Sequence, residues 1–409
     1  MESKKFLALF AFALLLAGCV SQAQQENPLP TLQPTQTAVA SPTKTIAAST
    51  PTIQPTQEFQ PTTQPYLNPH RNSPETPSDA EREKLPECGQ LKFTEFPVDM
   101  NQVYEINPLG NLAPPGHTIP TEHSYLHLNA GGSTQELHEL HSPASVFITS
   151  ISGGPGLTRD PFDYTIYFSL CKNVVGYYNH VKQLSPRMLE AKKTGNCNKN
   201  QGSEYEYCEI PLEKFSAGET MGKVGGLQGN FDFGLMDFSK PHVFANPARY
   251  GARTPYINCP YEHYEKEKKE KFFSLIKRDD EGQCGFVAQD VAGTLQGNWF
   301  YGDARTDSPT GWDASLSFAI DDADPSTQVV SAGGKFTEAG VWEFTPTNAG
   351  NINRNFSQAT PKNAYCYQSA QRKEKVIVEI VNETSLRIEK QQGECSGTET
   401  LQNPIEYNR

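Results

Sequence analysis

Short segments in which apolar or β-branched residues alternate with polar ones recur along much of this chain. Clusters of Gly, Pro and Asn separate them, which is typical of strands joined by turns. The clearest of these segments are residues 145–151, 164–170, 173–178, 375–381 and 385–389. One further segment, 261–277, is rich in Glu and Lys and predicts a helix with a solvated charged face. The pattern therefore predicts a mainly β protein with one helix.

The N-terminal residues have the pattern of an export signal. Lys4 and Lys5 precede an apolar run at 6–16 that is too short to span a bilayer comfortably. The following Leu-Ala-Gly-Cys, which ends at Cys19, resembles the lipobox of prokaryotic lipoproteins. That resemblance implies that residues 1–18 are removed and that an acylated Cys19 anchors the chain in a lipid bilayer. The alternative is conventional cleavage near Ala17, which would leave Cys19 as a free thiol.

Residues 19–84 have the composition of a tether. They are rich in Pro, Thr, Gln and Ser and show no apolar periodicity. Such a segment buries too little surface to offset the entropy of ordering, so we expect it to be extended and partly polyproline-like. About sixty flexible residues span roughly 40 to 50 Å on average. The tether would thus hold the folded part away from the lipid, although it could equally be a passive spacer.

Globular composition begins near residue 85, and a loop-like stretch near residue 250 predicts two domains, 85–250 and 251–409. The formal net charge of −12 disfavours nucleic acid as a partner, because phosphates would be repelled. We find no Gly-Lys-Ser/Thr phosphate loop and no Gly-x-Ser-x-Gly elbow. Nucleotide hydrolysis and serine-hydrolase chemistry therefore have no support.

Apart from Cys19, the chain has eight Cys, an even number that indicates an oxidising, extracytoplasmic compartment. Eight Cys can pair in 105 ways. On proximity along the chain we expect two of the pairs to be Cys197 with Cys208 and Cys366 with Cys395.

Histidines are concentrated in one short region, since five of the nine lie between His117 and His141. On a strand, His123, Tyr125 and His127 would share one face, because side chains alternate with period two. Two imidazoles on one face can bind one metal ion, and neutral imidazole is the commonest ligand of zinc. The alternative is a set of hydrogen-bonded His side chains without any ion.

A resemblance to a known family covers residues 115–240. Short motifs in this region resemble, in order, those of lysostaphin-type (LytM-like) zinc endopeptidases, which cut the peptide cross-bridges of peptidoglycan. The motifs lie at 123–127, 142–146, 178–181, 218–225 and 230–233. The resemblance implies that residues 85–250 form a LytM-like β-sheet core of barrel-sandwich type, followed by a second β-rich domain.

By position, the resemblance implies a zinc site made of His123, His127 and Asp232. The family's first motif has Asp where this chain has His127, and its last motif has His where this chain has Asp232. These three residues still supply two imidazoles and one carboxylate, which is a known set of zinc ligands. His117 could replace either His as a ligand or lie behind the ligands.

The catalytic positions that the resemblance implies are His180 and Asn230. Asn230 stands where the family has a second catalytic His, and an amide cannot act as a base near neutral pH. If zinc is bound, it would polarise a peptide carbonyl while His180 stabilises the oxyanion or moves a proton.

These features support two main hypotheses. The first is a cell-surface lipoprotein whose degenerate LytM-like domain binds or scaffolds a cell-envelope polymer or a surface protein. The alternative is a divergent zinc metallopeptidase that cleaves envelope peptides or glycopeptides, and a solute-capturing lipoprotein that feeds a transporter is a third possibility. Residues 251–409 have no assigned role, and we expect Trp299, Trp312 and Trp342 to be core residues rather than sugar-stacking platforms.

Overall fold

The computed structural model describes residues 77–128, 136–154, 162–199, 204–278, 280 and 282–409. The expected signal peptide, Cys19 and nearly all of the expected tether lie outside the described residues. Among the described residues, no helix is both long and apolar enough to cross a lipid bilayer.

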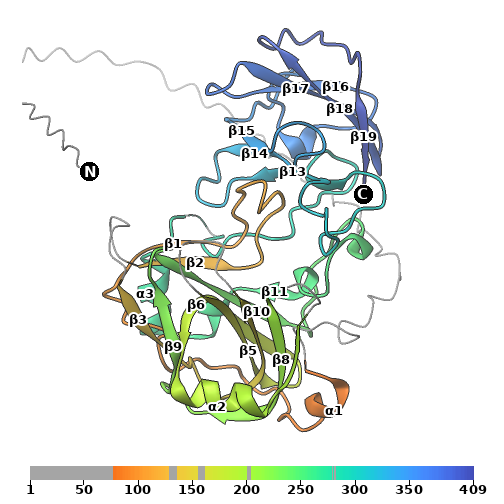
Figure 1. Ribbon diagram of the computed structural model, residues 1–409. Coiled ribbons are helices and arrows are strands. Elements are labelled where there is room, and N and C mark those ends of the chain that lie inside the picture. The colour runs from red at the N-terminus through yellow and green to blue at the C-terminus, as the bar shows by residue number, and fades with distance from the viewer. Residues whose placement is uncertain (1–76, 129–135, 155–161, 200–203, 279, 281) are drawn as a thin grey trace, which may run out of the picture. The chain divides into compact units, whose positions relative to one another are not determined.

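The fold is mainly β, as predicted, and consists of two antiparallel sheets with few helices (Figure 1). In the first sheet, the main path runs β1-β2-β10-β6-β5-β4-β8-β7, while β3, β9 and β11 branch from it. Its strands are β1 (Val103–Asn107), β2 (Ser124–Leu128), β3 (Leu137–His141), β4 (Val146–Gly154), β5 (Asp163–Cys171), β6 (Val174–Leu184), β7 (Asn196–Lys199), β8 (Glu206–Phe215), β9 (Thr220–Gly225), β10 (Asn230–Asp237) and β11 (Ile257–Asn258).

The second sheet has eight strands in the order β15-β14-β13-β12-β19-β18-β17-β16. They are β12 (Gly297–Phe300), β13 (Ser315–Ile320), β14 (Gln328–Ala332), β15 (Gly340–Phe344), β16 (Ala364–Gln368), β17 (Glu374–Asn382), β18 (Ser385–Gln392) and β19 (Ile405–Asn408). Across the two sheets, β4, β5, β6, β17 and β18 confirm the five segments that the alternation predicted as strands.

The helices are short. They are α1 (Asp79–Arg82), α2 (Pro186–Thr194) and α3 (Lys266–Phe273), with 3-10 turns η1 (Pro247–Arg249), η2 (Thr254–Tyr256), η3 (Pro260–His263) and η4 (Phe356–Gln358). The helix predicted at 261–277 is therefore shorter than expected. Tyr261 and Tyr264 are buried in the core, and the extended backbone at Tyr264 separates η3 from α3. Burial of these two rings thus takes precedence over a continuous helix.

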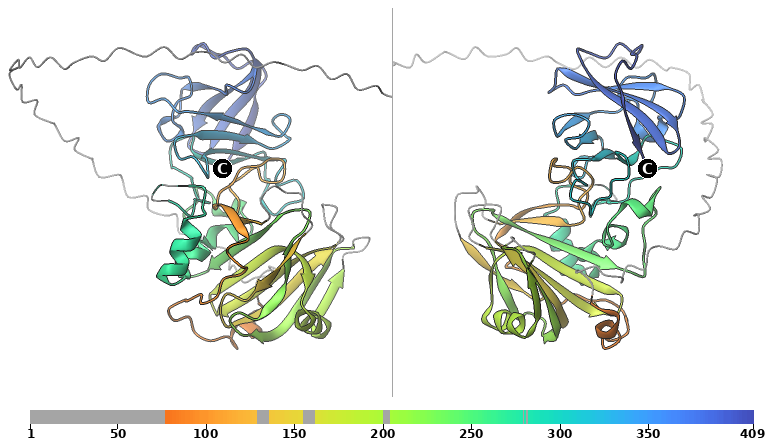
Figure 2. Two further views of the ribbon diagram at one scale, coloured as in Figure 1. Left: turned by 90° about the vertical axis from the view of Figure 1, so that its left-hand side faces the viewer. Right: turned by 45° about the vertical axis from the view of Figure 1, so that its right-hand side comes forward.

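The core of the first sheet forms because its strands are two-faced. On β10, Phe231, Phe233 and Leu235 lie in the apolar core, while Asp232 between them points to the opposite face. Phe272 of α3 joins the same core, so the chain beyond residue 250 also packs against this sheet. The strands curve around the core, as Figure 2 shows.

The second sheet has a separate apolar core that includes Trp299 and Trp342, both fully buried. Trp312 is half-buried against a third cluster. The expectation that the Trp residues are core residues is confirmed for Trp299 and Trp342.

Four disulfides tie the described chain together. They include both pairs that were expected, and the full set is Cys88–Cys171, Cys197–Cys208, Cys259–Cys284 and Cys366–Cys395. Disulfides persist in oxidising compartments, so their presence indicates an extracytoplasmic location.

We expect the Cys88–Cys171 bridge to stabilise the fold more than the Cys197–Cys208 bridge. The first closes a loop of 83 residues and the second a loop of 11, so loop-closure entropy predicts a difference of about 2 kcal/mol in the free energy of unfolding. Urea unfolding of the two Cys→Ser double variants measures it. Equal loss of stability in both variants would contradict the prediction.

Candidate functional site

The candidate site lies on the face of β10 that is turned away from the apolar core, and its centre is Asp232. This residue pairs with Tyr125 of β2 on one side and with Asn179 of β6 on the other. Residues directly opposite each other in a sheet share a face, so the three side chains form one row across three strands. The Asp232 side chain is only 1% exposed, which makes it a buried carboxylate.

One oxygen of Asp232 is surrounded by nitrogen atoms. Its Oδ2 lies 3.2 Å from Nε2 of His123 and 3.3 Å from Nε2 of His180. The side-chain amide of Asn179 donates a hydrogen bond to the same oxygen at 3.1 Å. A carboxylate buried in a sheet is thus compensated by groups from β6 and from the residue that precedes β2.

His180 reaches Asp232 because β6 has a bulge at this point. Between Tyr164 and Ile166, β5 advances by two residues while β6 advances by three, from Val181 to Tyr178. His180 has a φ of 63°, which is rare for a residue with a side chain. The extra residue changes the direction of the His180 side chain, so that it and the preceding Asn179 contact the same carboxylate.

The second ring nitrogen of His180 also contacts a carboxylate. Its Nδ1 lies 2.9 Å from Oδ2 of Asp163, the first residue of β5. The other oxygen of Asp163 lies 3.5 Å from Nζ of Lys182, whose side chain is 4% exposed. Asp232, His180, Asp163 and Lys182 therefore form a chain of groups in which negative and positive charge can alternate.

The charges of the two carboxylates determine the protonation of His180. Burial alone would lower the pKa of this imidazole, but the negative charge of Asp232 and the hydrogen bonds with Asp163 and Asp232 outweigh it and raise the pKa to about 10. For Asp232, burial alone would raise the pKa, but the neighbouring imidazoles and the hydrogen bonds from His180 and Asn179 hold the pKa well below its usual range. His180 is therefore a cation paired with an anion at neutral pH.

His123 differs from His180 in its charge. Burial lowers the pKa of His123, which the attraction of Asp232 only partly offsets. His123 is therefore neutral at pH 7, and we describe its 3.2 Å approach to Asp232 as a polar contact rather than an ion pair.

Aromatic rings surround His123. The ring centroids of His117 and Tyr125 lie 5.7 Å and 4.9 Å from that of His123, and Trp312 lies 5.7 Å from His117. Burial lowers the pKa of His117 to about 4, so this imidazole is also neutral. The site therefore combines a charged centre with an aromatic, uncharged flank.

His127 lies further along β2, opposite Asn230 rather than Asp232. Its ring is 5.8 Å from that of Tyr104, which is 49% exposed. Burial lowers the pKa of His127 as well. The site thus extends along the strands from His123 to the His127–Asn230 pair.

Several buried polar atoms along this face have no hydrogen-bond partner among the described residues. They include Nδ1 of His117, Nε2 of His127, Oδ1 of Asn230 and Oδ1 of Asp232. Buried polar atoms are nearly always hydrogen-bonded in native proteins, so this cluster of unpaired atoms calls for a further partner such as water, an ion or a ligand.

The predicted zinc set is brought together only in part. His123 contacts Asp232, but His127 lies beside Asn230. Among the described residues, only two sets of three His, Cys, Asp or Glu have ligand atoms that all lie within 4.8 Å of one another, and both contain disulfide-bonded Cys. The site has the residue types that zinc prefers, yet neither His127 nor His180 completes a converged ligand set with His123 and Asp232.

Three residues of this site were not predicted from the sequence. Asp163 has no motif around it and is brought in only by the pairing of β5 with β6. Asn179 lies inside the predicted motif, but its role depends on the strand register. Glu122, which pairs with Arg253 at 3.0 Å beside His123, carries no sequence signal that we recognise.

Comparisons with known proteins do not identify a family. No family model matches the chain, and no curated protein matches it. Two solved structures of Helicobacter pylori Csd3, from hexagonal and orthorhombic crystals, are similar over 44% of this chain, with 12% and 15% identity and TM-scores of 0.24 and 0.23. The chain spans 37% and 39% of those two chains. Likeness of this degree does not establish the function, which has to be inferred from the site.

We expect His180 to titrate near pH 10 rather than near 6.5. Folding raises the pKa of His180, so protonated His180 stabilises the folded state. This stabilisation is complete below about pH 6.5 and is lost as the pH rises towards 10. Asp163→Asn removes one of the two carboxylates and should lower this pKa. NMR titration of the imidazole signals measures it, and a value near 6.5 in the unmodified protein would contradict our assignment.

Proposed function

We propose that the first sheet is an extracytoplasmic binding module that holds a polar segment of an envelope polymer or of a surface protein without cleaving it. The observation that carries this proposal is the row of buried, unpaired polar atoms at His117, His127, Asn230 and Asp232. The disulfides support its location outside the cytoplasm.

The unpaired atoms also indicate the chemistry of the ligand. Oδ1 of Asn230 and Oδ1 of Asp232 can only accept hydrogen bonds, whereas each neutral imidazole can donate one and accept one. A ligand with N–H or O–H groups and acceptors nearby, such as a peptide or a glycopeptide, satisfies such a set. The half-buried rings of His117 and Trp312 can pack against the less polar parts of the ligand.

Binding is favoured over hydrolysis because neither of the two expected catalytic positions, His180 and Asn230, carries a free base. Both ring nitrogens of His180 already contact carboxylates, Asp163 and Asp232. Asn230 occupies the other expected catalytic position and cannot accept a proton near neutral pH. A water molecule bound here would therefore have no side chain at either of these positions ready to take its proton.

Zinc-dependent peptide hydrolysis is the second candidate. One observation favours it: Asp163 orients the His180 ring, as carboxylates orient metal-bound or catalytic imidazoles in many enzymes. It requires His123, Asp232 and a third ligand to converge on one ion, which they do not do in this arrangement.

An acylated Cys19 and the Pro/Thr-rich segment at 19–84 would place this module at the outer surface of a membrane. The lipobox-like sequence and the composition of the segment support this part of the proposal. The anchor is independent of the binding site and can be tested by mass spectrometry of the mature N-terminus.

Replacing Asn230 by Leu should separate binding from stability. Oδ1 of Asn230 has no partner in the described fold, so an apolar residue of similar size should leave the free energy of unfolding unchanged or raise it by up to about 1 kcal/mol. The loss of one ligand hydrogen bond should weaken binding about tenfold. Co-sedimentation with envelopes of the source cells and urea unfolding measure the two effects.

The matched control is Asn196→Leu, which changes an exposed Asn on β7. It should bind like the unmodified protein. If Asn230→Leu binds equally well, or if it binds poorly because it is unfolded, the site assignment is wrong.

Element analysis distinguishes the two candidate functions. We expect less than stoichiometric zinc in the purified protein, because the ligand atoms do not converge. One zinc per chain that is lost in both His123→Ala and Asp232→Ala would refute this expectation and favour the metallopeptidase.

A further inference from the structure

The second sheet carries a cavity of about 920 Å³, far along the chain from the Asp232 site. Its walls come from β15, from the turn that joins β16 to β17, and from the residues after β18. The lining includes residues 343–345, 368–374 and 392–394. β15 and β16 are the two end strands of this sheet, so the cavity lies where both edges contribute to it.

The edge of β16 is already covered by Asn353. The side-chain amide of Asn353 donates to the carbonyl of Gln368 at 3.2 Å, and the backbone N–H of Gln368 donates to the Asn353 side-chain oxygen at 2.9 Å. Asn353 thus pairs with both main-chain groups of Gln368, as a neighbouring strand would. It adopts a φ of 49°, which Asn tolerates better than most residues.

β15 differs, because among the described strands it pairs only with β14. Part of β15 lies within 8 Å of β16, so the open part of its second edge is the end at residues 343–345, which lines the cavity. Such an edge is a template for one more strand, and many proteins bind extended peptides in this way.

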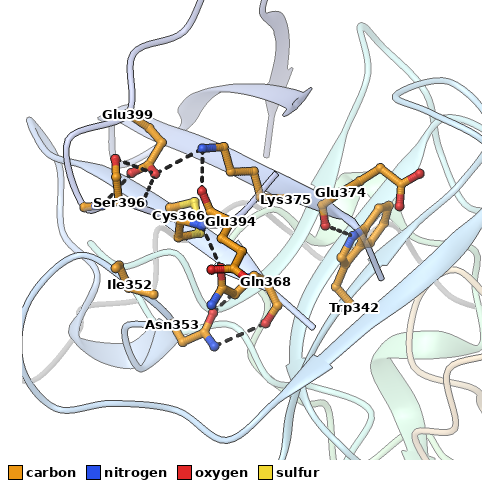
Figure 3. The surroundings of a disulfide bond; sticks show 12 residues. Trp342, Ile352, Asn353, Cys366, Gln368, Glu374, Lys375, Glu394, Ser396 and Glu399 are labelled. Carbon is orange, nitrogen blue, oxygen red and sulfur yellow. Dashed lines mark hydrogen bonds and ion pairs between the residues drawn. A yellow bond between two sulfur atoms is a disulfide. The ribbon is translucent and has the colours of Figure 1, made fainter. Parts of the chain in front are cut away.

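The opposite wall is held in place before any ligand binds. The Cys366–Cys395 disulfide attaches the segment after β18 to β16, and the backbone N–H of Cys395 donates to the side chain of Gln368 at 2.7 Å. Nζ of Lys375 donates to the carbonyl of Glu394 at 2.9 Å (Figure 3). A wall that is fixed in advance lowers the entropic cost of binding.

Charged side chains of both signs line the cavity without partners. Among the described residues, Glu343, Lys373 and Glu394 form no ion pair and no side-chain hydrogen bond. Arg372 also lines the cavity, where its guanidinium lies 4.4 Å from the ring centroid of Trp342. A complementary ligand therefore carries both basic and acidic groups.

The described part of the cavity lining offers no open aromatic face on which sugars could stack. Among the described residues, Phe344 is the one aromatic residue in its lining and is only 7% exposed, while Trp342 is fully buried beneath Arg372. Sugar rings are usually bound on the open face of an aromatic side chain. The lining consequently favours a peptide over a glycan.

We propose that this cavity is a second binding site, which takes an extended peptide segment with both basic and acidic side chains as an added strand along the end of β15 that lines the cavity. The main-chain groups of β15 supply affinity, and the charged rim selects the sequence. This site is independent of the proposed function of the first sheet.

Selection of a phage-displayed random 12-residue peptide library on the full chain tests the proposal. Selected peptides should contain both Lys or Arg and Asp or Glu. Synthetic versions, measured by fluorescence anisotropy, should bind at least tenfold more weakly to Ala370→Trp, which adds a bulky ring to the cavity lining, and to Glu343→Lys. Methylation of alternate peptide amides, which removes strand hydrogen bonds, should abolish binding in one register only.

Two control variants show whether the peptides bind in this cavity. Glu338→Lys makes the same charge change at an exposed residue outside the cavity lining and should leave binding unchanged. Asn230→Leu tests the first sheet and should also leave peptide binding unchanged. The proposal is overturned if no peptide is selected, if Ala370→Trp binds as tightly as the unmodified protein, if amide methylation in either register has no effect, or if the cavity variants instead lose binding to oligosaccharides on a glycan array.

Discussion

The described site depends on the burial of one ionised carboxylate in the middle of an antiparallel sheet. An unpaired buried charge would cost several kcal/mol, so Asp232 is compatible with this position only because cationic and polar groups surround it. His180 supplies the positive charge, and Asn179 and His123 supply further polar contacts. The bulge in β6 directs the His180 ring towards Asp232, and Asp163 holds the ring there.

This compensation also explains why the site is suited to binding. Both ring nitrogens of His180 contact carboxylates, and the polar atoms of His127 on β2 and Asn230 on β10 have no hydrogen-bond partner among the described residues. Preorganised polar atoms of this kind hydrogen-bond a ligand without first breaking bonds within the protein. The second sheet shows a comparable arrangement, in which a disulfide fixes one wall of a cavity whose lining also includes the end of β15.

Much of the fold could be predicted from local sequence, whereas the site could be predicted only in part. Alternation correctly placed five strands, and proximity along the chain correctly paired Cys197 with Cys208 and Cys366 with Cys395. Which side chains meet across strands depends on register, which is set by residues far apart in the chain. For this reason the sequence did not reveal that His127 lies opposite Asn230. No local pattern predicts the left-handed backbone of His180 or the contact of Asp163 with its ring.

A double-mutant cycle tests most directly whether the Asp232–His180 pair organises the site. The free energy of unfolding is measured by urea denaturation for the unmodified protein, Asp232→Asn, His180→Gln and the double variant. We predict a coupling energy of about 2 kcal/mol or more, because each single change leaves a buried group without its partner. Additive effects of the two changes, with a coupling energy near zero, would contradict this account.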